Sequence, residues 1–145
     1  MSIKFPKILV IDDSRAFRVF VHESIRASIK DARIFEGDNG YDAITLFKKH
    51  TPDLVLLDIN MPKLDGKETL KYIIKINPHA KIIVTTAYDD DQTIINQLMH
   101  FGASKFVSKP MNRMILMKSV TDILSSTKVA GTHNQISKSI VLDNH

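Results

Sequence analysis

The 145-residue chain contains no cysteine. Disulfide bonds, thiolate chemistry and cysteine-based zinc sites are therefore excluded. The chain also has no long apolar run near its start, because residues 8–11 are interrupted at once by two aspartates. Four apolar residues are too few for a signal-peptide core or a membrane span. We therefore expect a soluble, cytoplasmic protein that makes no membrane contact.

Clustered basic residues are missing as well. The net charge is +4, but no run of five or more basic residues occurs, and no basic stretch alternates with aromatic residues. Direct nucleic-acid binding is therefore not expected. The six histidines show no metal-ligand spacing, which favours solvated surface positions. Hydrophobic residues make up 43% of the chain, enough for a core, and the length is typical of one domain.

Short apolar runs alternate with amphipathic stretches along most of the chain. The predicted strands are residues 7–11, 33–36, 54–57, 81–85 and 105–108. The predicted helices cover about 14–29, 40–49, 67–77, 89–101 and 112–126. In the fourth of these, one face directed at the core is expected to contain Ile94, Ile95, Leu98 and Phe101. This alternation predicts an α/β fold: a doubly wound, flavodoxin-like parallel sheet of five strands in the order 2-1-3-4-5, with five helices.

The predicted domain covers residues 1–126. Residues 127–145 lack a clear hydrophobic period and are too few for a second domain, so we expect a loosely ordered tail. Four apolar residues in this tail leave room for a docking segment or an extra helical turn. They are Ile136, Ile140, Val141 and Leu142.

Polar side chains follow four of the five predicted strands, where each strand ends. They are Asp12 and Asp13 after residues 8–11, Asp58 and Asn60 after residues 54–57, Thr86 after residues 82–85, and Lys109 after residues 106–108. The carboxyl ends of parallel strands share one edge of a sheet, and ligands bind outside that edge in doubly wound folds. The pattern therefore predicts a binding site for a divalent cation and a phosphoryl group.

Each of these groups has a chemical use and a plainer explanation. The carboxylates of Asp12 and Asp13 suit Mg²⁺, which prefers oxygen ligands, but the pair equally suits a turn that caps a helix. Asp58 is placed to attack a phosphoryl group and form an acyl phosphate, although aspartate also commonly begins turns. Lys109 and Thr86 suit phosphoryl oxygens, yet a surface lysine and a strand-end threonine explain them singly. These residues indicate one binding site only if all of them share one edge of the sheet.

Taken together and in order, these segments resemble the receiver domain of two-component response regulators. The matching segments are Asp12-Asp13, Asp58-Ile59-Asn60-Met61-Pro62 followed by Asp65-Gly66, Thr86-Ala87, and Lys109-Pro110. The resemblance covers residues 5–126, in a layout similar to single-domain receivers such as the chemotaxis response regulator. It implies that Asp58 is the phosphoacceptor. It also implies Mg²⁺ as the cofactor, held by Asp13, Asp58 and the Asn60 backbone carbonyl, with Asp12 acting partly through water.

The resemblance assigns a second group of residues to the response. Thr86 would bind the phosphoryl group and move with the switch, Lys109 would pair with that group, and the Lys109–Pro110 bond is expected to be cis. Phe106 matches an aromatic switch position, although a core aromatic in the fifth strand is the alternative. Tyr88 occupies a position that controls water access in this family, so we expect slow autodephosphorylation.

The last helix has two distinct sides. One is expected to be core and consists of Leu116, Met117, Val120, Ile123 and Leu124. Met111, Met114 and Ile115 fall roughly opposite, and exposed methionines suit adaptable partner surfaces. We therefore expect a partner or dimer contact there, with burial of Met111 and Met114 as the alternative.

The resemblance implies a signalling switch, not an enzyme with a separate substrate, although the domain would assist its own phosphorylation and dephosphorylation. A sensor histidine kinase or phosphotransfer protein would phosphorylate Asp58. The face made by the fourth helix, fifth strand and fifth helix would then bind a downstream target. A receiver-like interaction module that is never phosphorylated is the main alternative. A phosphatase is disfavoured, because such enzymes need an acid at the position of Asn60.

Overall fold

Five parallel strands form one sheet in the order β2-β1-β3-β4-β5, as predicted. They are β1 (Lys7–Ile11), β2 (Arg33–Gly37), β3 (Leu54–Asp58), β4 (Ile82–Thr86) and β5 (Lys105–Ser108). The computed structural model describes residues 5–61, 63–87 and 91–126. All five residues of β3 and of β4 are buried, which explains the continuous apolar runs at residues 54–57 and 82–84.

Helices follow the strands and begin at polar caps. They are α1 (Arg15–Ser28), α2 (Gly40–His50), α3 (Gly66–Ile76), α4 (Gln92–His100) and a last helix over residues 113–126, here called the C-terminal helix. The side chain of the residue directly before each helix accepts a hydrogen bond from a backbone amide of the first turn. These residues are Ser14, Asn39, Asp65, Asp91 and Asn112.

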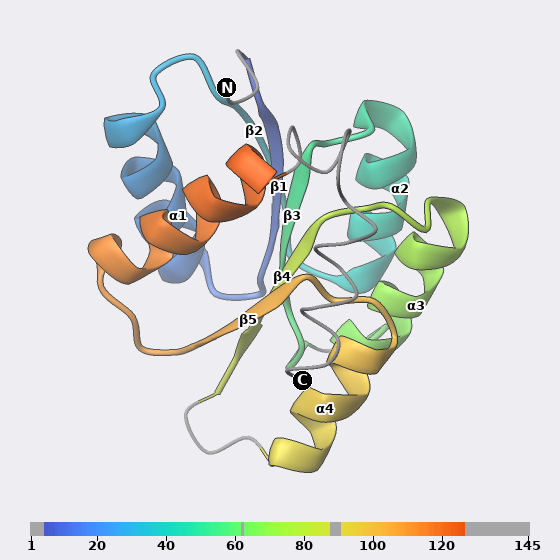
Figure 1. Ribbon diagram of the computed structural model, residues 1–145. Helices are drawn as coiled ribbons and strands as arrows, with labels where there is room; N and C mark the ends of the chain where they lie inside the picture. Colours follow the sequence, from blue (N-terminus) through green and yellow to red (C-terminus); the bar gives the residue numbers. More distant parts are fainter. Residues whose placement is uncertain (1–4, 62, 88–90, 127–145) are drawn as a thin grey trace.

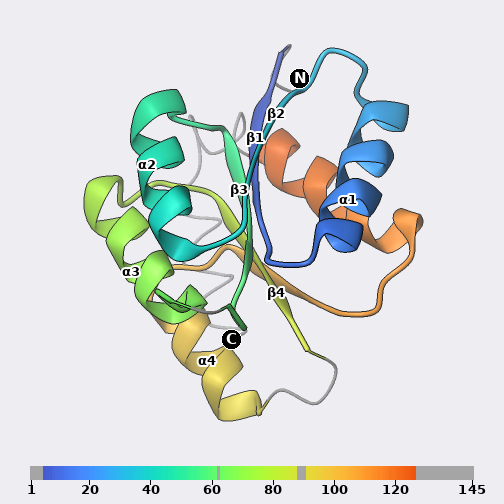
Figure 2. The same cartoon turned by 180° about the vertical axis from the view of Figure 1, so that it is seen from behind.

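The helices cover both faces of the sheet. Figure 1 shows α1 and the C-terminal helix on one face, with α2, α3 and α4 on the other; Figure 2 shows the same layers from behind. Each face has its own core. The first includes Val21, Ile25, Leu116 and Val120. The second includes Ala43, Phe47, Leu70, Ile73 and Leu98. The predicted doubly wound, flavodoxin-like sandwich is confirmed.

At the margins of helices, one prediction of side-chain burial is wrong and one stated alternative is confirmed. Ile94 was expected to face the core but is 41% exposed; it lies one residue, or about 100°, from the buried Ile95 and so at the edge of the apolar stripe. Met111 takes the alternative given above, because it is half-buried against the core and does not lie on the exposed side. The helical period does not apply to Met111, because the C-terminal helix begins only at residue 113. Met114 and Ile115 are exposed as predicted.

The register brings strand ends to a common edge. Ile11 pairs with both Gly37 and Leu57, and Asp58 pairs with Thr85. Asp12 after β1, Asp58 at the end of β3 and Lys109 after β5 therefore lie at the same carboxyl edge of the sheet. Across the described ranges, no helix combines the length and the apolar character that a membrane crossing requires.

Candidate functional site

Three carboxylates gather at the carboxyl edge of the sheet. Asp12 directly follows β1, Asp58 ends β3, and Asp13 completes a group whose carboxylate oxygens lie within 4.8 Å of one another. Asp12 and Asp58 are only 1% and 4% exposed, whereas Asp13 is exposed. Like charges this close repel, and burial deprives them of water, so the cluster requires nearby positive charge.

Lys109, which follows the edge strand β5, supplies a positive charge to this cluster. Its Nζ lies 2.6 Å from Asp12 Oδ2 and 3.6 Å from Asp58 Oδ2. The backbone holds the lysine in this place, because its amide donates to the carbonyl of Thr86 at 2.7 Å. The Lys109–Pro110 peptide bond is cis, as the resemblance implied. We call Asp12, Asp13, Asp58 and Lys109 the acidic site.

The environment of Asp58 favours its protonated form. Burial raises the pKa of its carboxyl group to about 6, and the neighbouring charges of Asp12 and Asp13 act in the same direction. The Asn60 amide opposes the shift by donating to Asp58 Oδ1 at 2.9 Å, and the Lys109 ammonium opposes it as well. Asp58 therefore ionises at a higher pH than an ordinary aspartate, although it is still mostly ionised at neutral pH.

The composition of the acidic site fits a hard divalent cation. Mg²⁺ prefers carboxylate oxygens and usually retains several waters. Three carboxylates within 4.8 Å offer those oxygens, and the one ammonium in the acidic site leaves negative charge uncompensated. The exposed Asp13 gives the cluster an open side. Asp12, Asp13 and Asp58 could therefore hold such an ion.

Thr86 ends β4, and Asn60 lies two residues beyond the end of β3, both at the carboxyl edge of the sheet. Thr86 is fully buried, and its hydroxyl lies 3.3 Å from that of Ser108. The side chains of Thr86 and Asp58 leave opposite faces of the sheet, because Asp58 pairs with Thr85. The backbone amide of Asn60 binds Asp58, which fixes the loop at the site.

Phe106 lies away from the acidic site. Its side chain is 39% exposed, so the alternative of a core aromatic is wrong. It lines a groove of about 940 Å³ between α4, β5 and the C-terminal helix. The groove is lined by Gln92, Ile95, Asn96, Met99, His100, Ser104, Lys105, Phe106, Asp122, Ile123 and Ser126. We call it the Phe106 groove.

Sequence reasoning missed three residues beside the acidic site. Arg18 donates to the backbone carbonyl of Asp12 at 2.6 Å, and the ring of Phe17 lies 4.3 Å from Lys109 Nζ. Thr85 is 1% exposed, and its hydroxyl has no hydrogen-bond partner in the described part of the protein. The β4 register was the available signal for Thr85, because the partner of Asp58 in an adjacent strand points to the same face.

Two predictions fall on residues that the structure leaves undescribed. Tyr88, expected to limit access of water, lies outside the described residues, as does the tail over residues 127–145. Both therefore stay predictions.

A family model and two curated relatives match most of the chain. Residues 8–121 match the family model of the response regulator receiver domain. The chain is 30% identical over 119 residues to the chemotaxis protein CheY of Bacillus subtilis, which covers 82% of this chain and 98% of CheY. It is 32% identical over 114 residues to the transcriptional regulatory protein DegU of Brevibacillus brevis, covering 79% of this chain and 48% of DegU.

A solved structure shows the same fold. The signal receiver domain of a putative Luxo repressor protein from Vibrio parahaemolyticus superimposes with a TM-score of 0.78 at 27% identity, over 87% of this chain and 95% of that one. The chain thus spans nearly all of CheY but about half the length of DegU.

Proposed function

The chain belongs to the receiver domain family of response regulators, and we propose that it is a Mg²⁺-dependent phosphorylation switch that accepts a phosphoryl group on Asp58. The observation that carries the proposal is the placement of Lys109, whose ammonium lies 2.6 Å from Asp12 and 3.6 Å from Asp58. A cation at this position can neutralise the charge that develops on phosphoryl oxygens. Family membership itself supports a role in two-component signalling.

The proposed reaction is a transfer between two side chains. An ionised Asp58 oxygen attacks phosphorus, the bond between phosphorus and the donor's histidine nitrogen breaks, and Asp58 becomes an acyl phosphate. Mg²⁺ held by Asp12, Asp13, Asp58 and the Asn60 backbone carbonyl would neutralise charge on the phosphoryl group. The Lys109 ammonium, already near Asp58, binds a phosphoryl oxygen and loosens its contact with Asp12. The donor is a sensor histidine kinase or a phosphotransfer protein.

The readout is proposed to pass through Thr86 and Phe106. The Thr86 hydroxyl now lies 3.3 Å from that of Ser108. Because it points to the other face of the sheet from Asp58, it would have to turn over the carboxyl edge to reach a phosphoryl oxygen, and this movement would leave space for Phe106 to repack. Phosphorylation thereby changes the affinity of the Phe106 groove for a downstream protein, or for a second copy of the chain, by shifting the balance between two existing states. The domain assists its own phosphorylation and dephosphorylation but has no separate substrate. We place this activity in the cytoplasm.

Intact-mass measurement tests the proposal directly. The protein is incubated with acetyl phosphate and Mg²⁺, alongside Asp58→Asn and a matched surface variant, Asp122→Asn. We expect one phosphoryl adduct on the wild type and on Asp122→Asn, none on Asp58→Asn, and none on the wild type when EDTA replaces Mg²⁺.

Two outcomes would contradict the proposal. An equal adduct on Asp58→Asn would assign the phosphoryl group to another residue. No adduct on the wild type, with acetyl phosphate or with a phosphorylated cognate kinase, would identify the chain as an interaction module that is not phosphorylated.

A further inference from the structure

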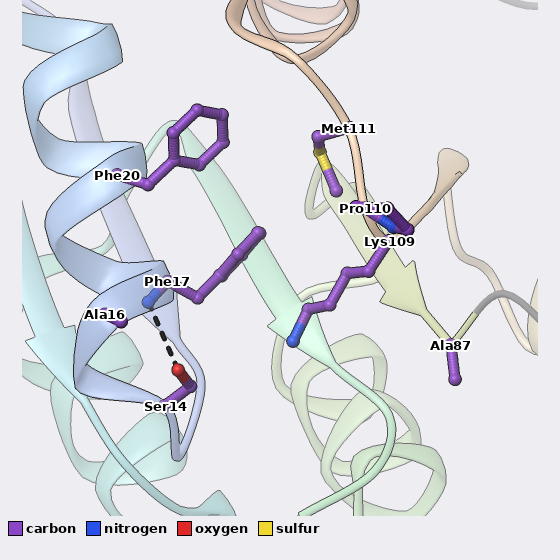
Figure 3. Close-up of a pocket in the computed structure, with 8 residues that line it drawn as sticks. All are labelled: Ser14, Ala16, Phe17, Phe20, Ala87, Lys109, Pro110 and Met111. Carbon is purple, nitrogen blue, oxygen red and sulfur yellow. Dashed lines mark hydrogen bonds between the residues drawn. The ribbon is translucent and has the colours of Figure 1, made fainter.

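The side chain of Lys109 has an aromatic neighbour as well as its two carboxylates. Its Nζ lies 4.3 Å from the centre of the Phe17 ring, within the distance at which a cation is attracted by the negative face of an aromatic ring. Figure 3 shows Phe17 projecting from α1 toward Lys109. The two residues line a groove of about 580 Å³ together with Ser14, Ala16, Phe20, Ala87, Pro110 and Met111.

The position of Phe17 is fixed by the start of α1. Its backbone amide donates to Ser14 Oγ at 3.2 Å, which caps the helix. Its ring packs against that of Phe20 with the centroids 5.8 Å apart. One residue along, Arg18 donates to the Asp12 carbonyl at 2.6 Å and ties the first turn of α1 to the end of β1. The ring is therefore held next to the acidic site by the backbone and by packing.

Lys109 needs such a constraint more than the carboxylates do. Lysine has a flexible four-carbon stem and a point charge, and the side chain of Lys109 is still 27% exposed. Asp12 and Asp58 attract its ammonium but do not restrict the stem that carries it. A ring 4.3 Å from the ammonium restricts the stem and attracts the charge at once, whereas an aliphatic residue in its place would only fill volume.

We propose that Phe17 is a positioning residue that holds the Lys109 ammonium between Asp12 and Asp58, where a phosphoryl oxygen bound to Asp58 would meet it. The effect on phosphoryl transfer rests on the function proposed above. The positioning itself is a property of the unphosphorylated protein and is testable without the reaction.

The first test observes Lys109 directly. The protein is labelled with ¹³C,¹⁵N-lysine and studied by NMR without Mg²⁺ or phosphodonor, and the Lys109 resonances are assigned with Lys109→Arg. We expect the Hε protons of Lys109 to be shifted upfield by the ring in the wild type and in Phe17→Tyr, and to lose that shift in Phe17→Leu. Unchanged Lys109 resonances in Phe17→Leu would overturn the proposal.

The second test measures the consequence for transfer. At a subsaturating concentration of acetyl phosphate with Mg²⁺, adduct formation should be about three- to tenfold slower in Phe17→Leu, the range expected for a cation–π contact of this kind. Phe17→Tyr, which keeps the ring, should be within about twofold of the wild type. Phe20→Leu is the matched control, because it removes a ring of the same size from the same groove without removing the neighbour of Lys109.

The controls separate positioning from packing. An equal loss of rate in Phe20→Leu, or no recovery in Phe17→Tyr, would assign Phe17 a packing role and overturn the proposal. If Phe17→Leu does not fold, as judged by far-UV circular dichroism, Phe17→Met replaces it in both tests. If the wild type forms no adduct, the proposed function fails, and the Lys109 resonances still decide whether Phe17 positions the ammonium.

Discussion

The acidic site and the Phe106 groove shift the pKa of an aspartate in opposite directions. Asp58 in the acidic site is buried, and burial raises the pKa of its carboxyl group to about 6. Asp122 at the Phe106 groove is exposed, and a hydrogen bond from Lys118 at 3.3 Å lowers the pKa of its carboxyl group. Lys105 adds a second ion pair to Asp122 at 3.5 Å.

The difference shows which of the two regions lowers the stability of the folded state. A buried carboxylate with a raised pKa destabilises the folded state at neutral pH, so the ionised form of Asp58 lowers the stability of the folded protein. The charges of the Phe106 groove remain in water, where exposed ion pairs contribute little in either direction. Substitutions in the acidic site should therefore change stability strongly, whereas equivalent substitutions at the groove should change it weakly.

The largest difference is expected between two glycines. A Cβ added at Gly66, next to the acidic site, would lie 2.2 Å from Ile59 Cα and 2.6 Å from the Asp58 carbonyl oxygen. Backbone cannot rotate away, so Gly66→Ala should lower the free energy of unfolding by about 3 kcal/mol or more, measured by urea denaturation. It should also displace Asp58 and reduce adduct formation with acetyl phosphate.

Gly102, at the end of α4, is the matched position near the groove. Its φ of +120° disfavours alanine, but the added Cβ would meet only the flexible side chain of Ile74, at 3.0 Å. We expect Gly102→Ala to cost about 1–2 kcal/mol and to leave adduct formation unchanged. An equal loss of stability in the two variants would show that the backbone around Asp58 is no more tightly packed than the end of α4.

More of the acidic site than of the Phe106 groove could be predicted from the sequence, because the geometry of parallel strands places the acidic-site residues. Parallel strands align their carboxyl ends, so Asp12, Asp58 and Lys109 could be brought together from their positions along the chain alone. The Phe17 contact and the raised pKa of Asp58 depend on side-chain direction and burial, which the strand pattern does not contain.

The groove side depended on helical periodicity, which gives the direction of an apolar face but not its width or its neighbours. Leu116, Val120 and Leu124 were placed correctly in the core, whereas Ile94 was not. The Phe106 groove itself is a gap between three elements, and no spacing in the sequence records how closely they approach.

The second prediction concerns the pH dependence of stability. The pKa of Asp58 is about 6 in the folded state and 3.8 without the fold, so the folded state binds more protons between these values. Stability from this group is fully present below pH 3.8 and is lost as pH rises through about 6. Asp58→Asn cannot ionise and should escape this loss. Its free energy of unfolding relative to wild type should therefore rise by about 1 kcal/mol from about pH 4.5 to about pH 7.5 in EDTA, after allowance for screening.

Asp122→Asn is the control, because the pKa of Asp122 is shifted in the opposite direction to that of Asp58. The lowered pKa of Asp122 means that its stabilisation is present above its unfolded pKa and is lost only as pH falls. Its difference from wild type should stay constant over the same pH range. If urea denaturation gives Asp58→Asn and Asp122→Asn the same pH profile, Asp58 is not perturbed by burial and the contrast between the two regions fails.

The smallest expected effect separates two hydroxyl groups. Thr85, the strand partner of Asp58, buries a hydroxyl that no described group satisfies, whereas Ser104 in the groove accepts a hydrogen bond from the amide of Ile82 at 3.1 Å. Thr85→Val removes an unsatisfied polar atom and keeps the shape, so it should raise the free energy of unfolding by about 1 kcal/mol. Ser104→Ala leaves an amide unpaired and should lower it by about 1 kcal/mol. Opposite signs in thermal unfolding would support the contrast. A loss of stability in Thr85→Val would instead show that its hydroxyl has a partner in solution, such as a water molecule at the acidic site.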